Sequence, residues 1–352
     1  MEENLCFDMV ASMLRLGRKP RRGQCNPSYS FSRREALVRT LNDIDHCDSA
    51  FSHISNCCFE IPLPYRMTTT VGVTAALAGS PSQRSTGALF SLANRVALVT
   101  GGHRGIGLEI ALGFAEAGAV VYCLDLPSSP DESWRMVQSW AASLPEPNSG
   151  RLEYVSGDVT DQKAMWEVVE KIVEKEGRID VCMANAGIVH VAECLEYPAE
   201  DFKRVMDVNV SGVLFTAQAA GQQMERLGIP GSIIMTASMS GTITNPNQHS
   251  SAYNISKSAV LQLARSMACE LAPKGIRVNT ISPGYIYTDM TRSILDTQPQ
   301  PASLKEKLGA QNPMGRFGRP DELRGAALWL ASDGATFCTG SDIKVDGGQC
   351  AW

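Results

Sequence analysis

Tyr253 and Lys257 are the two side chains whose types and spacing point most directly to chemistry. Four residues apart on a helix, they lie on one face, one turn from each other. A free tyrosine has a pKa of about 10 and is a poor base at neutral pH. An ammonium about 4.5 Å away, at an effective dielectric constant of about 20, favours the phenolate by roughly 3.7 kcal/mol. We therefore expect Lys257 to lower the pKa of the Tyr253 phenol until it exchanges protons near neutrality.

A glycine-rich segment, TGGHRGIG at residues 100–107, supplies a second signal. The apolar run Val96–Val99 precedes it and predicts a buried strand. Ile106, Ile110 and Phe114 follow at a spacing of four and predict a helix. A glycine turn between strand and helix lets phosphates approach the backbone, where the unpaired N–H groups of the helix start bind them. This context indicates nucleotide binding.

In this order and separation, the glycine-rich segment and the Tyr/Lys pair resemble the short-chain dehydrogenase/reductase family over about residues 90–352. Further motifs of the family follow in order: Asp158-Val159, Asn185-Ala186-Gly187, Asn209 within Val-Asn-Val, Ser238 within Ala-Ser-Met-Ser-Gly, and Pro283-Gly284. The resemblance implies a Rossmann fold, a nicotinamide cofactor and a small-molecule substrate.

By this resemblance, the reaction is a reversible hydride transfer between the nicotinamide and an alcohol or carbonyl carbon, without a metal. Tyr253 would move the proton, while Lys257 would lower its pKa and hold the nicotinamide ribose. Ser238 would orient the substrate oxygen, because the family's serine usually lies three residues before the glycine of this loop. Ser240, in the same loop, remains the alternative. Asn209 would position a water that links Lys257 to solvent.

The resemblance also implies a set of cofactor contacts. They are Gly101, Arg104, Gly105, Ile106, Gly107, Asp125, Asp158, Val159, Asn185, Tyr253, Lys257, Ile286 and Thr288. Asp125 follows Gly107 by eighteen residues and ends an expected strand. A carboxylate there accepts hydrogen bonds from both ribose hydroxyls and repels a 2′-phosphate, which favours NAD. Arg104 favours the opposite choice, because a guanidinium pairs well with that phosphate. We expect NAD, with NADP as the alternative.

Composition excludes several other classes of protein. The chain has 352 residues, of which 44% are hydrophobic and 20% charged, an ordinary globular composition. No apolar run approaches the roughly 18 residues that a membrane span needs. The formal charge of −5 and the lack of a basic stripe argue against nucleic-acid binding. The eleven cysteines show no CxxC pair or metal-ligand spacing, so we interpret them as reduced thiols.

Predicted strands and helices alternate along the rest of the core. Strands are expected at 120–124, 152–155, 181–184, 232–236, 277–281 and near 342–345, and helices at 161–176, at 199–224 and around the Tyr/Lys pair. Strands joined by helices imply right-handed crossovers and a parallel sheet. We predict one doubly wound α/β domain over residues 89–352, with the cofactor across the carboxyl ends of the strands.

Residues 1–88 form an N-terminal extension outside this domain. The first 66 residues carry nine basic and eight acidic residues and five cysteines, without clear periodicity. We expect a disordered or artefactual extension on a cytoplasmic enzyme, and Met67 is an alternative start of translation. Eight basic residues and one acidic residue between Met13 and Leu41 keep mitochondrial import as a second option. Cysteines and histidines near residues 46–58 match no metal-binding spacing.

The sequence says less about the substrate than about the cofactor. The loop 236–241 with Asn245, and the run Gly340–Ile343, resemble the fungal polyol and ketose enzymes of the family. Polar side chains expected to frame the cleft and to bind hydroxyls are Asn245, Asn247, Gln248, His249, Tyr285 and Tyr287. One alternative is a ketoreductase of secondary metabolism, and another is a catalytically inactive nucleotide-binding protein.

Small side chains along the long helix suggest how copies of the chain associate. They are Gly212, Ala217, Ala219, Ala220 and Gly221. We expect them to let two helices approach closely, in a homotetramer or homodimer.

Overall fold

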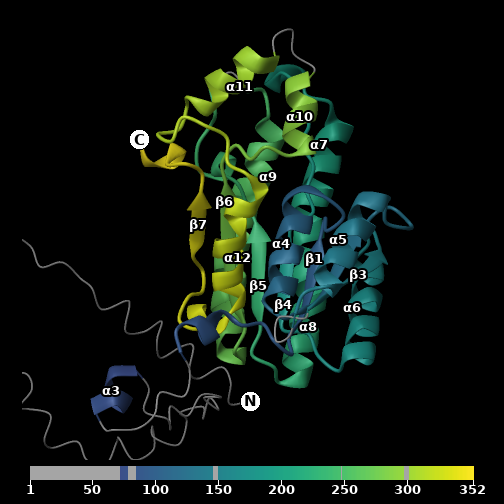
Figure 1. Ribbon diagram of the computed structural model, residues 1–352. Helices are drawn as coiled ribbons and strands as arrows, with labels where there is room; N and C mark the ends of the chain where they lie inside the picture. The colour runs from purple at the N-terminus through teal and green to yellow at the C-terminus, as the bar shows by residue number, and fades with distance from the viewer. Residues whose placement is uncertain (1–71, 78–84, 146–149, 247, 297–300) are drawn as a thin grey trace, which may run out of the picture. The chain divides into compact units, whose positions relative to one another are not determined.

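The computed structural model describes residues 72–77, 85–145, 150–246, 248–296 and 301–352. Within them, parallel strands form one seven-stranded sheet in the order β3-β2-β1-β4-β5-β6-β7 (Figure 1). The strands are β1 (Val96–Thr100), β2 (Val120–Asp125), β3 (Arg151–Ser156), β4 (Val181–Ala184), β5 (Ser232–Thr236), β6 (Arg277–Pro283) and β7 (Asp342–Val345). The strand order reverses between β1 and β4, which makes this the switch point where such sheets bind ligands. The predicted doubly wound α/β fold is confirmed.

Helices cover both faces of the sheet (Figure 1). One face carries α4 (Gly105–Glu116), α5 (Glu132–Ala142) and α12 (Arg324–Ala331), and the other carries α6 (Gln162–Glu176), α8 (Gly212–Leu227) and α9 (Ser251–Leu271). Successive side chains of a strand point to opposite faces. Leu98 therefore joins the core under α6, α8 and α9, while its neighbour Val99 joins the core under α4, α5 and α12.

Residues next to the helices fix where several of them begin and end. The Asp161 carboxylate accepts a hydrogen bond from the Ala164 N–H at 3.0 Å and starts α6. Gly177 ends the same helix in the left-handed region, with a φ of 76°. Asp131 starts α5 by accepting from the Trp134 N–H at 2.9 Å. These cues lie within three residues of each helix end, so the sequence indicates them directly.

The prediction of one long helix over residues 199–224 is wrong in one respect, because the helix is interrupted. The chain forms α7 (Ala199–Met206), then one π-helical turn at Asp207–Ser211, and then α8. A π turn inserts one extra residue and rotates the side chains that follow it. Asn209 occupies the middle of that turn, so the interruption lies at a predicted site residue.

Two helices that the sequence analysis did not predict lie beyond the carboxyl ends of the strands (Figure 1). They are α10 (Asp289–Asp296) and α11 (Pro301–Gly309). A small core of Leu295, Leu308 and Phe317 holds them together. The remaining short elements are α3 (Gly72–Leu77) and the 3₁₀ turns Gly87–Phe90, Cys194–Glu196, Met239–Gly241 (η4), Ala272–Lys274, Pro320–Leu323, Asp333–Ala335 and Gln349–Ala351 (η8).

The small side chains of α8 have a role different from the one expected. Ala217, Ala219 and Ala220 are buried against the chain's own sheet and helices. A Cβ at Gly212 would lie 2.7 Å from the Val159 side chain, and a Cβ at Gly221 would contact Ile233. These residues let α8 pack closely inside one copy of the chain, so they are not evidence for contact between copies.

The expectations about the extension, Met67 and the cysteines near residue 57 fall on residues outside the described ranges. Within those ranges, no helix is long and apolar enough to cross a membrane. The six cysteines of the described part, Cys123, Cys182, Cys194, Cys269, Cys338 and Cys350, are all free thiols. No group of three or more acidic, histidine or cysteine side chains in that part is arranged to hold a metal ion.

Candidate active site

The glycine-rich loop folds tightly against the start of α4. Gly101 and Gly105 have positive φ angles of 65° and 57°, a region that favours glycine. A Cβ at Gly107 would lie 2.1 Å from the Gly101 carbonyl oxygen, so only glycine fits there. Arg104 precedes the helix and makes no side-chain cap. The backbone N–H groups of the first turn therefore lack a side-chain partner and suit the phosphates of a dinucleotide.

Asn185 connects three strands at the switch point. Its Nδ2 donates to the Thr100 carbonyl oxygen at 3.0 Å, and its Oδ1 accepts from the Thr236 hydroxyl at 3.0 Å. The side-chain amide thus bonds to the ends of β1 and β5 from the end of β4. Asn185 shapes the cofactor loop through these bonds.

Asp125 lies at the carboxyl end of β2, beside the glycine-rich loop. Its two carboxylate oxygens accept from the backbone N–H groups of His103 at 3.2 Å and Leu126 at 2.9 Å. These bonds fix the carboxylate and leave each oxygen one further lone pair for a ligand. Arg104 is exposed, and within the described ranges its guanidinium has no hydrogen-bond or ion-pair partner.

Sequence reasoning missed a cluster around His103. The imidazole Nδ1 lies 3.4 Å from the Tyr154 hydroxyl, and Nε2 lies 3.0 Å from an Asp131 oxygen. Both partners come from segments at least 28 residues away, so no local spacing could have identified them. The cluster fixes the side of the glycine-rich loop whose His103 N–H bonds to Asp125.

The other expected cofactor residues divide between turn formation and packing. The Asp158 carboxylate accepts from the N–H and hydroxyl of Thr160 at 2.9 and 2.8 Å, which orders the turn before α6. Val159 is buried. Ile286 is also buried, and the Thr288 hydroxyl lies 3.1 Å from that of Thr291 at the start of α10.

Lys257 and Asn209 meet beside Gly187. A Cβ at Gly187 would lie 3.3 Å from Asn209 Oδ1 and 3.5 Å from Lys257 Nζ. The Asn209 amide donates to the Ile188 carbonyl at 2.9 Å and accepts from the Ile188 N–H at 2.8 Å. Lys257 Nζ donates to the Thr236 carbonyl at 2.7 Å. The π turn and α9 thus bring two residues 48 positions apart to one point.

The pKa of the Tyr253 phenol is shifted in the direction opposite to the one expected. Burial raises the pKa of the Tyr253 phenol above its ordinary value of 10.0, and the hydrogen bond with Ser238 opposes this effect only in part. Burial also lowers the pKa of the Lys257 ammonium from 10.5 to about 8. The lysine nitrogen lies 5.6 Å from the centre of the tyrosine ring. Loss of solvent disfavours the charged form of each group, which raises the pKa of the phenol and lowers that of the ammonium.

The geometry separates the two candidate serines. Ser238 is hydrogen-bonded to Tyr253, and its hydroxyl oxygen accepts from the Ser240 N–H at 3.1 Å. The Ser240 hydroxyl instead accepts from the Asn245 amide at 2.9 Å. Of the two serines, Ser238 is therefore the one bonded to Tyr253, in agreement with its position before the glycine.

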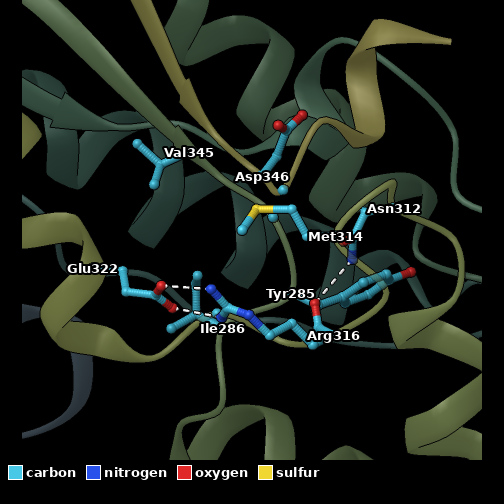
Figure 2. A pocket seen from close by; sticks show the side chains of 11 residues that line it. Tyr285, Ile286, Asn312, Met314, Arg316, Glu322, Val345 and Asp346 are labelled. Atoms are coloured by element: carbon cyan, nitrogen blue, oxygen red, sulfur yellow. Dashed lines mark hydrogen bonds and ion pairs between the residues drawn. The ribbon is translucent and has the colours of Figure 1, made fainter.

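Most of the polar residues expected to frame the cleft bond to the protein itself. Asn245 is buried, Gln248 donates to the Tyr285 hydroxyl at 2.7 Å, and His249 lies 3.0 Å from a Glu193 oxygen. Tyr287 is stacked on Phe317 and lies beneath the Lys305 ammonium. Asn247 falls outside the described residues. Figure 2 shows a small pocket that Tyr285 and Ile286 line together with Asn312 and Asp346.

Several known proteins are similar to this chain over most of the residues that the structure describes. A protein-family model described as enoyl-(acyl carrier protein) reductase matches residues 101–349. A sorbose reductase from Schizosaccharomyces pombe is 42% identical over 265 residues, which are 75% of this chain and 98% of that protein. A probable NADP-dependent mannitol dehydrogenase from Yarrowia lipolytica is 40% identical over 74% of this chain and 89% of its own length. The crystal structure of a short-chain type dehydrogenase/reductase from Mycobacterium marinum matches with a TM-score of 0.69 and 42% identity, covering 75% of this chain and 99% of that one.

Proposed function

This chain belongs to the short-chain dehydrogenase/reductase family, oxidoreductases that use NAD or NADP, and we propose that it interconverts a polyol and the corresponding ketose. The observation that carries the substrate class is the similarity to a sorbose reductase and a mannitol dehydrogenase, at 42% and 40% identity over about three quarters of the chain. The loop after β5 carries Ser238 beside Tyr253, and most of its other polar side chains bond to the protein itself, so the proposed substrate class rests on the relatives.

In the proposed mechanism Tyr253 is the proton donor for carbonyl reduction. When bound, the nicotinamide supplies the hydride. The raised pKa of the phenol keeps it protonated at neutral pH, which is the form that an acid requires. Ser238 keeps its proton, donates a hydrogen bond to the substrate oxygen and aligns the carbonyl with the phenol. In the oxidation of an alcohol the same two residues work in reverse.

Lys257 serves as the proton store of the site. Its pKa of about 8 is close to neutrality, so it exchanges protons there more readily than the phenol does. Nζ would also hold the ribose of the nicotinamide, and Asn209 lies beside Nζ near Gly187. Asn209 holds a water that connects the ammonium to solvent.

For the cofactor, we propose a preference for NAD that rests on the fixed Asp125 carboxylate. NADP is the second candidate, because Arg104 is exposed and has no partner within the described part of the chain. The similarity to an NADP-dependent mannitol dehydrogenase favours this second candidate.

A substrate panel with both cofactors tests the proposal. Hexitols and pentitols should be oxidised, and ketohexoses reduced, with kcat/KM at least about tenfold above that for 2-hexanone, the scale of one or two extra hydrogen bonds. A preference for apolar ketones would favour the ketoreductase alternative. Cofactor binding without turnover of any carbonyl or alcohol would favour the inactive binding protein.

We also propose a homotetramer or homodimer in the cytoplasm, on the family resemblance alone. Light scattering at micromolar concentration tests the assembly, and a monomer would contradict it. Fluorescence microscopy of the tagged full-length chain tests the location. Mitochondrial fluorescence would instead favour the import signal expected between residues 13 and 41.

A further inference from the structure

The last residues of the chain reach the loop that carries Ser238. Gln349 Nε2 donates to Asn245 Oδ1 at 2.9 Å, and Asn245 Nδ2 donates to Ser240 Oγ at 2.9 Å. The Ser240 N–H then donates to Ser238 Oγ at 3.1 Å. All four residues are at least nine-tenths buried, with exposures from 2% to 8%. A continuous buried path therefore joins the chain's end to the proposed catalytic hydroxyl.

A local turn holds Gln349 at its end of this path. Gly347 and Gly348 have positive φ angles of 66° and 88°. The Asp346 carboxylate accepts from the N–H groups of Gly348 and Cys350, both at 2.9 Å. Asp346 itself lies at the end of β7 beside the pocket shown in Figure 2. The sequence Asp-Gly-Gly thus fixes the backbone on which Gln349 stands.

The other end of the path is held by the Tyr/Lys helix. A Cβ at Gly241 would lie 2.8 Å from the Lys257 carbonyl group, so η4 packs directly on α9. The Ser258 hydroxyl donates to the Gly241 carbonyl at 2.7 Å. The η4 turn is therefore held by contacts with α9 on one side and with Asn245 on the other. We therefore expect a change at Asn245 to alter the position of Ser238 relative to Tyr253.

The Gln349 side chain contributes little to stability through its oxygen. Gln349 Oε1 is buried and has no hydrogen-bond partner within the described structure. An unpaired buried acceptor is unfavourable, and a well-folded protein seldom retains one without a functional reason. The amide nitrogen, by contrast, makes the bond that fixes Asn245.

We propose that Gln349 is a positioning residue for Ser238, acting through Asn245 and Ser240. The Ser240 N–H occupies one lone pair of the Ser238 hydroxyl oxygen, which directs the hydroxyl proton toward the substrate oxygen. Gln349 holds the amide of Asn245 in the one orientation that donates to Ser240. The C-terminal segment is therefore part of the reactive site of its own chain. This inference rests on the proposed function.

The test compares Gln349→Met with a matched control, Gln138→Met. Gln138 lies on α5 and donates one bond to the Leu152 carbonyl at 2.7 Å, outside the Ser238 path. Gln349→Met should lower kcat for ketohexose reduction about tenfold, the scale of one buried hydrogen bond. The affinity for the cofactor, followed by nicotinamide fluorescence, should stay within about twofold, whereas the melting temperature should fall by a few degrees, because Asn245 Oδ1 loses its donor. Gln138→Met should lower the melting temperature and leave kcat unchanged.

The double variant Asn245→Ala/Gln349→Met tests whether the two residues act along one path. Its kcat should equal that of Asn245→Ala alone within about twofold, because residues of one network are not additive. An unchanged kcat in Gln349→Met, a multiplied loss in the double variant, or an equal loss in Gln138→Met would each overturn the inference. A wild-type protein that transfers no hydride to any carbonyl overturns the proposed function as well. An active wild type with an unaffected Gln349→Met variant overturns the inference alone.

Discussion

The two halves of the cleft are built in different ways. In the cofactor half, the loop after β1 takes its shape from glycines close together in sequence, such as Gly101 and Gly107, although Asn185 and Asp131 also anchor it from farther along the chain. In the reactive half, contacts join distant segments: Asn209 bonds to Ser256 across 47 positions, and Asn245 bonds to Gln349 across 104. From this difference we infer that phosphate binding depends mainly on backbone shape, whereas proton transfer depends on buried side chains that only the whole fold assembles.

The largest effect should come from the reactive half, at Tyr253. Tyr253→Phe removes the hydroxyl that donates the proton and keeps the ring, so the protein should fold and bind cofactor normally. Turnover should fall at least about 10²-fold, the usual scale for a lost general acid or base. Steady-state kinetics and nicotinamide fluorescence measure the two properties. Turnover near that of the wild type would remove the mechanism.

Lys257→Met should separate activity from stability in the same half. Turnover should fall at least about 10²-fold, and cofactor binding should weaken because the ribose contact is lost. A pKa lowered from 10.5 to about 8 means that the unfolded chain binds a proton more tightly, so the folded state carries a penalty of about 3 kcal/mol at pH 7.

The folded state carries the full free-energy penalty below pH 8, and the penalty falls to zero as the pH rises toward 10.5. Lys257→Met removes the penalty and also the bond to the Thr236 carbonyl. The melting temperature at pH 7 should therefore stay level or rise, and the gain should shrink at pH 10. Calorimetry at the two pH values checks this, and a drop in melting temperature at pH 7 would show that the lysine is a net stabiliser.

In the cofactor half, Asp125→Ser decides between the two cofactors. The variant loses two charge-assisted bonds to the ribose, each worth roughly 1.5–3 kcal/mol, and relieves repulsion of a 2′-phosphate. The ratio of kcat/KM with NAD to that with NADP should fall at least about 10²-fold. A wild type that already prefers NADP, or an unchanged ratio, would assign the choice to Arg104 instead.

Gly107→Ala tests whether backbone shape alone makes the phosphate site. The added methyl would lie 2.1 Å from the Gly101 carbonyl oxygen, so the loop must shift. Affinity for either cofactor should fall at least about tenfold, since several backbone N–H bonds are misplaced together. Gly325→Ala is the matched control, because a Cβ there meets nothing within 4 Å on α12. Equal affinities in the two variants would contradict the close-packed loop.

The smallest effect is expected outside both halves. Deleting residues 1–66 should leave kcat, cofactor affinity and melting temperature unchanged, because the family match spans residues 101–349 and the predicted domain starts at 89. Kinetics and calorimetry of the shortened chain check this. Failure of that chain to fold would show that the extension packs on the domain.

Sequence alone determined the features that local rules control. The glycine positions, the end of β2 at Asp125, and the spacing of Tyr253 and Lys257 on one helix all follow from neighbours within a few residues. The seven strands were predicted to within two residues at each end, because buried parallel strands are short apolar runs. The family resemblance then ordered the motifs along the chain.

Tertiary structure decided what depends on distant partners and on burial. The direction of the Tyr253 pKa was predicted incorrectly from spacing, because spacing carries no information about solvent. The π turn at Asn209 likewise has no signal in helical periodicity. The bond between Asn245 and Gln349 appears only when the loops after β5 and β7 meet. Chain neighbours set the backbone conformation, but the fold alone determines which buried polar groups share a low-dielectric space.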